Sequence, residues 1–173
     1  RVGTLNDGGV DGPLGASSSD AGNLVLNNGT LQYTGPNATF SRNFTLASIS
    51  TNIIEVSNAG TTLTLSGTNA ITTGALTKTG AGTLKLDGML NHTGITRVWD
   101  GILQYGIDNA LASGSLTVNG ASAFLDLGAY TDTVATVTLA AGSIVGSGTL
   151  TSTAGFSVNN TGASTCTVIL AGS

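Results

Sequence analysis

The chain has 173 residues, of which 40% are hydrophobic and only 8% are charged. This length is enough to bury one core, and the charged fraction lies far below the roughly 25% of ordinary soluble domains, so hydroxyl and amide side chains must make up the surface. Five Lys and Arg stand against nine Asp and Glu, which gives a net charge of −4 without any basic cluster. These values exclude nucleic acid and anionic membrane surfaces as partners, and no apolar stretch approaches the roughly 20 residues needed for membrane insertion.

Short runs of alternating apolar and polar residues recur from one end of the chain to the other. They cover residues 1–5, 23–26, 61–65, 82–86, 115–118, 135–139 and 148–151. Each run has a period of two, which predicts a β-strand with Leu or Val on the inside and Thr or Lys on the outside. Short stretches that end in Gly predict tight corners between the strands, and they lie at 27–29, 66–67, 87–88, 119–120 and 141–142. No segment keeps a helical period, so the sequence predicts an all-β protein.

Two internal repeats favour a solenoid over a β-sandwich or a barrel. The stretch NGTLQY at 28–33 returns as DGILQY at 100–105, and NLVLNNG at 23–29 is echoed by SLTVNG at 115–120. Units of about 20 residues indicate stacked coils. An aromatic content of 5% suits a narrow core filled by aliphatic ladders. We therefore predict a right-handed parallel β-solenoid (β-helix), a single elongated domain over residues 1–173 with roughly eight coils.

One motif in the middle of the chain has a specific resemblance. Residues 76–88, LTKTGAGTLKLDG, continue through NHTGITRV at 91–98. This motif resembles the autotransporter-associated β-strand repeat, and residues 15–18, 24–35 and 56–67 are similar to segments that accompany that repeat. The resemblance implies a parallel β-helix passenger of an exported bacterial protein, carried to the cell surface or into the extracellular space, and it implies no chemistry. Because the printed chain shows no signal peptide, we expect a segment or a processed subunit of a larger exported protein.

The acidic residues are the first candidates for chemistry, and each has a simpler structural interpretation. Asp126 with Asp132, or Asp7 with Asp11, could form the paired carboxylates of a glycosidase, although Asp in solenoids usually caps turns through the backbone. Residues 6–12, NDGGVDG, could wrap a calcium ion, but they lack the ligand spacing of an EF-hand and favour a turn. We therefore predict no catalytic residue, no cofactor and no metal site.

Three other features also have ordinary explanations. His92 replaces the Tyr of the repeat at a coil corner, so we expect it to pack there. Cys166 has no partner for an internal disulfide and lies in an apolar stretch, so we expect it to be buried in a strand. Thr-x-Thr pairs such as Thr62 with Thr64 could resemble an ice-binding surface if they stacked on one flat face, but outward Thr is common in strands.

Three functions remain open at this stage. The leading hypothesis is a structural surface element, such as a stalk, a fibre subunit or a matrix component. The second is an adhesin or carbohydrate-binding module, in which exposed aromatic residues, Trp99 and Tyr105 above all, would bind surface glycans. The third is a polysaccharide lyase, which would need clustered Asp and basic residues, with Asp100 and Arg97 as the nearest candidates. We expect no enzymatic activity.

The first and last residues of the chain predict how copies could assemble. Val2 and Leu5 belong to an apparent strand at the start, and an apolar strand with Val168, Ile169 and Leu170 lies at the end. Uncapped strands of this kind would expose core side chains and unpaired backbone. Because the two ends differ, contact between copies would be heterologous and would not close. We therefore predict end-to-end self-association into filaments.

Overall fold

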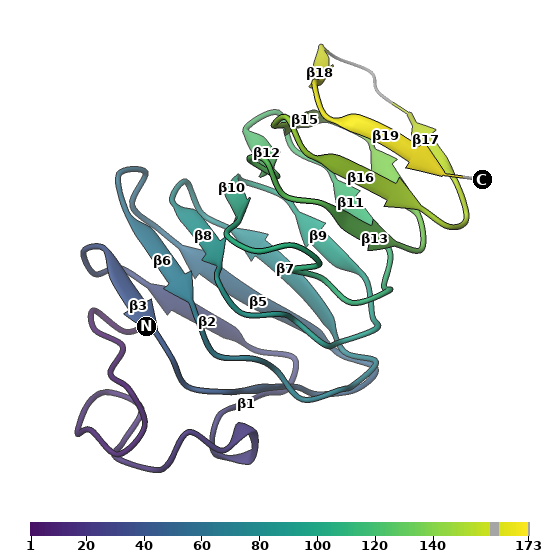
Figure 1. Cartoon of the computed structure of the whole chain (residues 1–173). Coiled ribbons are helices and arrows are strands. Elements are labelled where there is room, and N and C mark those ends of the chain that lie inside the picture. The colour runs from purple at the N-terminus through teal and green to yellow at the C-terminus, as the bar shows by residue number, and fades with distance from the viewer. Residues whose placement is uncertain (160–162, 173) are drawn as a thin grey trace.

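The computed structural model describes residues 1–159 and 163–172, and these residues form stacked coils of strands (Figure 1). In this part of the chain, two long sheets contain seven strands each. The first long sheet holds, in spatial order, β2 (Thr30–Tyr33), β5 (Thr51–Val56), β7 (Ala75–Thr79), β9 (Thr96–Val98), β11 (Leu116–Val118), β14 (Val137–Leu139) and β17 (Phe156–Val158). The second long sheet holds β3 (Ala38–Phe40), β6 (Thr62–Leu65), β8 (Thr83–Leu86), β10 (Gly101–Tyr105), β12 (Ala123–Asp126), β15 (Gly142–Val145) and β18 (Ser164–Cys166).

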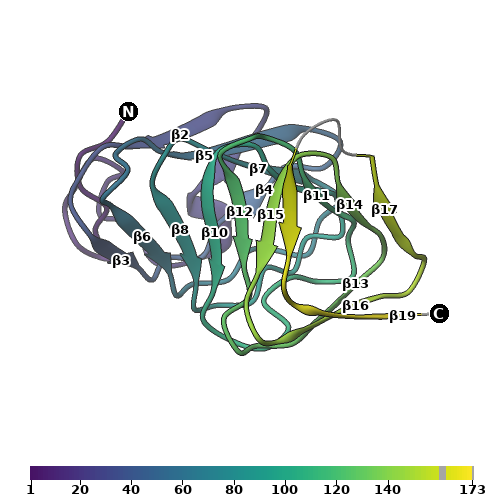
Figure 2. The same cartoon turned by 90° about the horizontal axis from the view of Figure 1, so that it is seen from above.

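A third side of the stack is less continuous. It begins with the pair β1 (Val25–Leu26) and β4 (Thr45–Leu46), and it ends with β13 (Asp132–Val134), β16 (Thr149–Ser152) and β19 (Ile169–Gly172). Between these groups, single bridges join Phe44 to Asn69 and Leu90 to Leu111. Figure 2 shows the strands of the second long sheet side by side, with the third-side strands β13, β16 and β19 beneath the later coils.

All strand pairs among the described residues are parallel, and each joins one coil to the next. This arrangement confirms the predicted all-β parallel β-solenoid and is incompatible with a sandwich of hairpins. The long sheets have seven strands rather than the estimated eight coils, because residues 1–24 contain only a three-residue 3-10 turn, η1 (Ala21–Asn23), and one bridge at Val2. The right-handed sense of the coil stays a prediction.

The core is built from aligned ladders of aliphatic side chains. On the inner face of the second long sheet, Leu63 is aligned with Leu84, Leu84 with Leu103 and Leu103 with Leu125. All four side chains are 0% exposed. The period of two in these strands places alternate side chains inside, and each fully buried Leu contributes about 1.5–3 kcal/mol. The stability of a coil therefore depends on the coils on both sides of it.

Tight corners bring the backbones of successive coils into contact. Gly80 and Gly101 occupy the same corner in neighbouring coils, with φ angles of 77° and 64°, a region that favours glycine. A Cβ at Gly101 would overlap the carbonyl oxygen of Gly80, and one at Gly80 would overlap that of Val56. Glycine is therefore required here both by the turn and by the close stacking of corners.

The first 24 residues differ from the strand predicted for them. Val2 forms a bridge with Tyr33, and Val2 and Leu5 are only 8% and 6% exposed, so this segment covers core side chains instead of leaving them open. The guanidinium of Arg42 holds the segment by donating to the carbonyls of Leu14, Gly15 and Ser17 and to the Ser17 hydroxyl. Contacts between residues about 25 to 34 positions apart hold this segment in place. A local sequence pattern cannot predict contacts over such separations.

The last coil leaves its inward side chains uncovered. Val158 and Leu170, which are aligned with the buried Leu139 and Leu150, are 66% and 43% exposed, whereas Val168 is buried. Ile169 is aligned with the outward Thr149 and is 61% exposed. Cys166 is aligned with the buried Ile144 but is itself exposed, contrary to the burial predicted for it. Inward-facing residues are buried only where another coil packs over them, and within the described residues none packs over β17, β18 and β19.

Candidate binding surface

The outer face of the first long sheet carries a row of mixed aromatic and polar side chains. Glu55 pairs with Thr79 in the strand register. The amide N–H of Trp99 donates to the Lys78 carbonyl at 3.0 Å, and the amide N–H of Asn119 donates to the Val98 carbonyl at 2.9 Å. These bonds extend the row from Thr79 to Trp99 and then to Asn119, with strands about 4.8 Å apart.

Trp99 is the most exposed side chain of this row that has a large apolar area. It follows β9 directly, it is 46% exposed, and it is the single Trp of the chain. Arg97 lies two residues earlier in β9, so its side chain is on the same outer face. We call Trp99, Arg97, Glu55, Thr79 and Asn119 the Trp99 surface.

Glu55 is the fixed charge of the Trp99 surface. Its Oε1 accepts hydrogen bonds from Nε2 of Gln32 at 2.9 Å and from the Ser57 hydroxyl at 2.7 Å. These two bonds lower the pKa of Glu55 below its usual value, so the carboxylate is ionised at neutral pH. Both bonds go to Oε1, and Oε2 retains its capacity to accept from a ligand.

Tyr105 cannot contribute to this surface, contrary to the prediction. It is 2% exposed and points inward in β10, aligned with the buried Leu86. Burial, together with the nearby carboxylate of Asp132, raises its pKa well above the usual value. Tyr33 is buried in the same way, at 1% exposure. The alternation of the strand predicts an inward Tyr105, because Tyr105 lies two residues after the inward Leu103.

A buried lysine beneath the Trp99 surface was missed by the sequence interpretation. Lys78 is 0% exposed, and its ammonium donates to the carbonyls of Thr79, Gly80 and Asp100 at 2.8, 2.6 and 2.9 Å. Burial lowers its pKa to about 8, and the charges of Asp100 and Glu55 oppose that shift. Lys78 lies two residues after the inward Leu76, so the period of two in the sequence could have indicated that Lys78 points inward.

Lys78 connects two neighbouring corners of the solenoid. Its three acceptors lie at the corner after β7 and at the corresponding corner one coil later, between Trp99 and Gly101. The ammonium therefore fixes the backbone immediately next to the Trp99 side chain. The corner glycines allow this convergence of carbonyl groups, which a Cβ would obstruct.

The acidic pairs considered for catalysis do not face one another. Asp126 lies on the outer face and accepts from Gln104 Nε2 and the Gly128 amide, both at 2.9 Å. Asp132 is buried and accepts from the amides of Leu111 and Thr133 at 3.1 and 2.7 Å. Asp126 binds a turn amide, as the structural interpretation predicts, whereas Asp132 binds one amide within β13 and one in the preceding coil.

The residues considered for metal binding or base catalysis also have structural contacts. Oδ1 of Asp7 accepts from the amide and the hydroxyl of Ser41, at 3.1 and 2.6 Å. His92 is 2% exposed, its Nε2 lies 2.9 Å from the Thr96 hydroxyl, and burial lowers its pKa to about 4. It is therefore neutral at physiological pH and packed inside, as predicted. Over residues 1–159 and 163–172, no group of three or more His, Cys, Asp or Glu side chains is arranged to hold a metal ion.

The Thr rows are too short to form a repeated array. In one row of the second long sheet, Thr64 is aligned with Thr39 in the preceding coil but with Lys85 in the next coil. In the neighbouring row, Thr62 is aligned with Thr83, and Thr83 is aligned with Ile102 in the next coil. The largest hydroxyl-rich area is thus limited to three coils. This interruption does not support an ice-binding surface.

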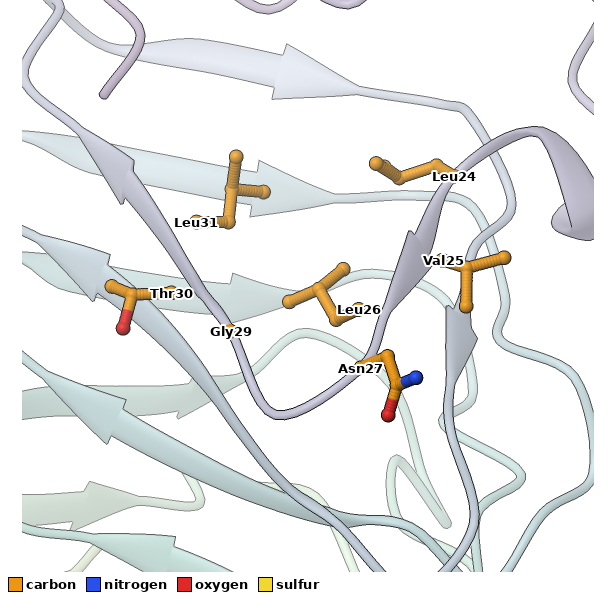
Figure 3. A pocket seen from close by; sticks show the side chains of 7 residues that line it. All are labelled: Leu24, Val25, Leu26, Asn27, Gly29, Thr30 and Leu31. Atoms are coloured by element: carbon orange, nitrogen blue, oxygen red, sulfur yellow. The ribbon is translucent and has the colours of Figure 1, made fainter.

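A hollow of about 320 Å³ lies beside the first coil, away from the Trp99 surface (Figure 3). It is lined by residues 24–27 and 29–31, and the side chains of Leu24, Leu26 and Leu31 lie between β1 and β2. Its lining contains no ionisable side chain. This hollow lacks the aromatic ring and the charged groups of the Trp99 surface.

These features define a parallel β-solenoid, with the Trp99 surface on one of its outer faces. Among the described residues no helix has the length and apolar character needed to cross a membrane. Residues 76–104 match the family model of the passenger-associated-transport-repeat. This match confirms the resemblance drawn from residues 76–98 and identifies an autotransporter passenger region, which is exported to the bacterial cell surface.

The chain is similar to the adhesin BmaC autotransporter of Brucella suis biovar 1 (strain 1330). The two are 45% identical over 152 residues, which is 87% of this chain. The chain spans only 4% of the length of that relative. No solved structure matches the chain.

Proposed function

We propose that this chain is a section of an adhesive passenger, which presents ligand-binding side chains on a rigid solenoid and catalyses no reaction. The observation that carries this proposal is the outer face of the first long sheet, where Trp99, Arg97 and Glu55 stand on strands held in parallel register. The similarity to an adhesin over 87% of the chain supports an adhesive role over a purely structural one.

The solenoid suits this role for a physical reason. Side chains on a parallel ladder are held by strands whose backbone groups are bonded on both sides, so little conformational freedom is lost when a ligand binds. The carboxylates considered for catalysis are instead engaged by backbone amides, as with Asp126 and Asp132. The outer faces are therefore better suited to recognition than to acid-base chemistry.

The test is adhesion by the purified chain. Beads coated with the 173-residue protein are applied to cultured animal cells, and bound beads are counted after washing. We expect the coated beads to bind above beads coated with serum albumin, and beads coated with an unfolded Leu84→Asp variant to bind at the albumin level. Equal binding by the folded and unfolded coats would contradict an adhesive function that depends on the solenoid.

End-to-end stacking into a filament is the second candidate. It is favoured by the last coil, where Val158, Ile169 and Leu170 expose apolar side chains. The first coil offers no equally open end, because Val2 and Leu5 are buried. Static light scattering of the purified chain from low to high concentration tests this candidate. A mass that grows without limit supports it, and a constant monomer mass rejects it.

A further inference from the structure

The Trp99 surface combines one aromatic ring with groups of every hydrogen-bonding type. Trp99 offers an indole face, Arg97 a guanidinium that only donates, Glu55 a carboxylate that only accepts, and Asn119 an exposed amide that does both. Thr79 adds a hydroxyl between Glu55 and Trp99. A ligand that fits this set needs an apolar face of about the size of one ring and polar groups around its rim.

The size of the apolar area separates a small ligand from a protein partner. A stable protein interface buries about 800 Å² on each partner and has an apolar centre. Among the described side chains on this outer face, Trp99 is the one large hydrophobic residue that is exposed, and the large apolar side chain of Ile53, two coils away, is half-buried. A single exposed ring fits one ring-sized group of a ligand instead.

The charges of the surface are close to balanced. Glu55 and the nearby Asp100 are acidic, Arg97 is basic, and the ammonium of Lys78 lies buried below them. An acidic ligand would meet the Glu55 carboxylate, which hydrogen bonds to Gln32 and Ser57 hold in place. A polycation would meet Arg97. The arrangement therefore favours an uncharged ligand.

We infer that the Trp99 surface binds a neutral pyranose unit of a surface glycan, with the sugar ring stacked on the indole of Trp99. The C–H groups on one face of a pyranose are apolar and pack on an aromatic ring, whereas its hydroxyls project around the rim. Those hydroxyls donate to Glu55 and accept from Arg97 and Asn119. This inference rests on the adhesive function proposed above and adds the site and the class of ligand.

The backbone beneath the site is fixed before any ligand binds. Trp99 and Asn119 are bonded to the preceding strands, and Lys78 Nζ donates to the carbonyl of Asp100, the residue after Trp99. A preformed site loses less entropy on binding than a mobile loop would. The single Trp thus stands on one of the better-anchored corners of the solenoid.

The experiment is a glycan array probed with the purified 173-residue chain. The array carries neutral glycans that end in glucose, galactose, mannose or N-acetylglucosamine, and matched glycans that end in sialic acid. Affinity for the strongest neutral glycan is then measured for the wild type and for Trp99→Ala, Trp99→Phe and Phe124→Ala. Phe124, which is 39% exposed in the second long sheet, is the matched control. Circular dichroism verifies that each variant keeps its β spectrum.

We expect binding to neutral glycans, a loss of at least about tenfold in affinity for Trp99→Ala, equivalent to about 1.4 kcal/mol, and wild-type affinity for Phe124→Ala. Trp99→Phe, which keeps a ring, should retain most of the binding. Binding of sialylated glycans alone, or unchanged affinity in Trp99→Ala, would overturn the inference. Coated beads that adhere to cells while the array stays empty would reject the sugar site and leave the adhesive function standing. Binding to neutral glycans on the array by a chain whose coated beads do not adhere to cells would reject adhesion and keep the sugar site.

Discussion

Two buried cationic side chains, one in the first segment and one in the central coils, donate hydrogen bonds to backbone carbonyls but differ in what surrounds those carbonyls. Arg42, 1% exposed, donates to the carbonyls of Leu14, Gly15 and Ser17 in the irregular first segment. Lys78, 0% exposed, donates to three carbonyls at the corners of two regular central coils. The first segment is mostly exposed and can move into water, whereas the central corners are locked between neighbouring coils. A buried hydrogen bond therefore stabilises most where its partners have no route to solvent.

The largest effect is expected in the ladder of the central coils. Leu84→Asp places a carboxylate between Leu63 and Leu103, where all three side chains are 0% exposed. Because each coil is buried only against its neighbours, we expect several coils to unfold together. The measurement is far-UV circular dichroism with urea titration. Leu170→Asp, at a position that is 43% exposed, is the matched control and should keep the β spectrum.

The next effect concerns the central cation. Lys78→Met keeps the length and apolar stem of the side chain but leaves the carbonyls of Thr79, Gly80 and Asp100 without this donor. We expect the free energy of unfolding to fall by about 3 kcal/mol, as measured by urea denaturation. A variant as stable as the wild type would mean that the three hydrogen bonds contribute nothing net.

The pH dependence of stability provides a third test in the same region. The pKa of Lys78 falls from 10.5 to about 8 on folding, so between these values the unfolded chain keeps a proton that the folded chain has lost. The stability of the wild type relative to Lys78→Met should therefore rise with pH over this window, by up to about 3 kcal/mol. Tyr33, Tyr105 and Cys166 have raised pKa values and oppose this trend at high pH, but they are present in both proteins and cancel in the difference. A flat difference between pH 7 and 10 would contradict the assignment.

The corresponding change in the first segment should be smaller and local. Arg42→Met removes the donors to Leu14, Gly15 and Ser17, but these carbonyls reach water once the segment detaches. We expect hydrogen exchange to accelerate over residues 9–17, with a global stability change below about 1 kcal/mol. Loss of exchange protection in the central coils as well would show that the two regions are not independent.

The smallest effect is expected at the outward neighbour of Leu84. Lys85 is 34% exposed and forms an ion pair with Asp87 at 2.8 Å. Surface pairs of this kind contribute little, so Lys85→Ser should change the free energy of unfolding by less than about 0.5 kcal/mol. If Lys85→Ser and Leu84→Asp had equal effects, the inner and outer faces would be reversed.

The central coils could be predicted from the sequence because their strands follow from the alternation of neighbouring residues. The period of two placed Leu84 inside and Lys85 outside, and the repeats indicated stacking. The same period, applied strictly, would also have placed Lys78 and Tyr105 inside, but charge and aromatic character suggested the surface. The first segment could not be predicted, since Val2 pairs with Tyr33 and Asp7 binds Ser41, and such long-range contacts leave no periodic signal.

The candidate binding surface could be predicted only in part. Trp99 was singled out as an exposed aromatic residue, and it is exposed. Its neighbours Glu55, Thr79 and Asn119 come from three other coils, and their alignment depends on coil lengths that vary along the chain. Only the register of the folded sheet brings them into one row.

Stacking of successive coils in a fixed register is the central claim, and engineered disulfides test it most directly. Thr64 and Lys85 are aligned neighbours on the outer face of the second long sheet, and Val145 lies in the same row several coils further on. Adjacent parallel strands place such Cα atoms about 5 Å apart, within the range that a disulfide spans. In a Cys166→Ser background, Thr64→Cys with Lys85→Cys should form an intramolecular disulfide under mild oxidation, and Thr64→Cys with Val145→Cys should not. Failure of the first pair to form, or equal formation by both pairs, would contradict the solenoid.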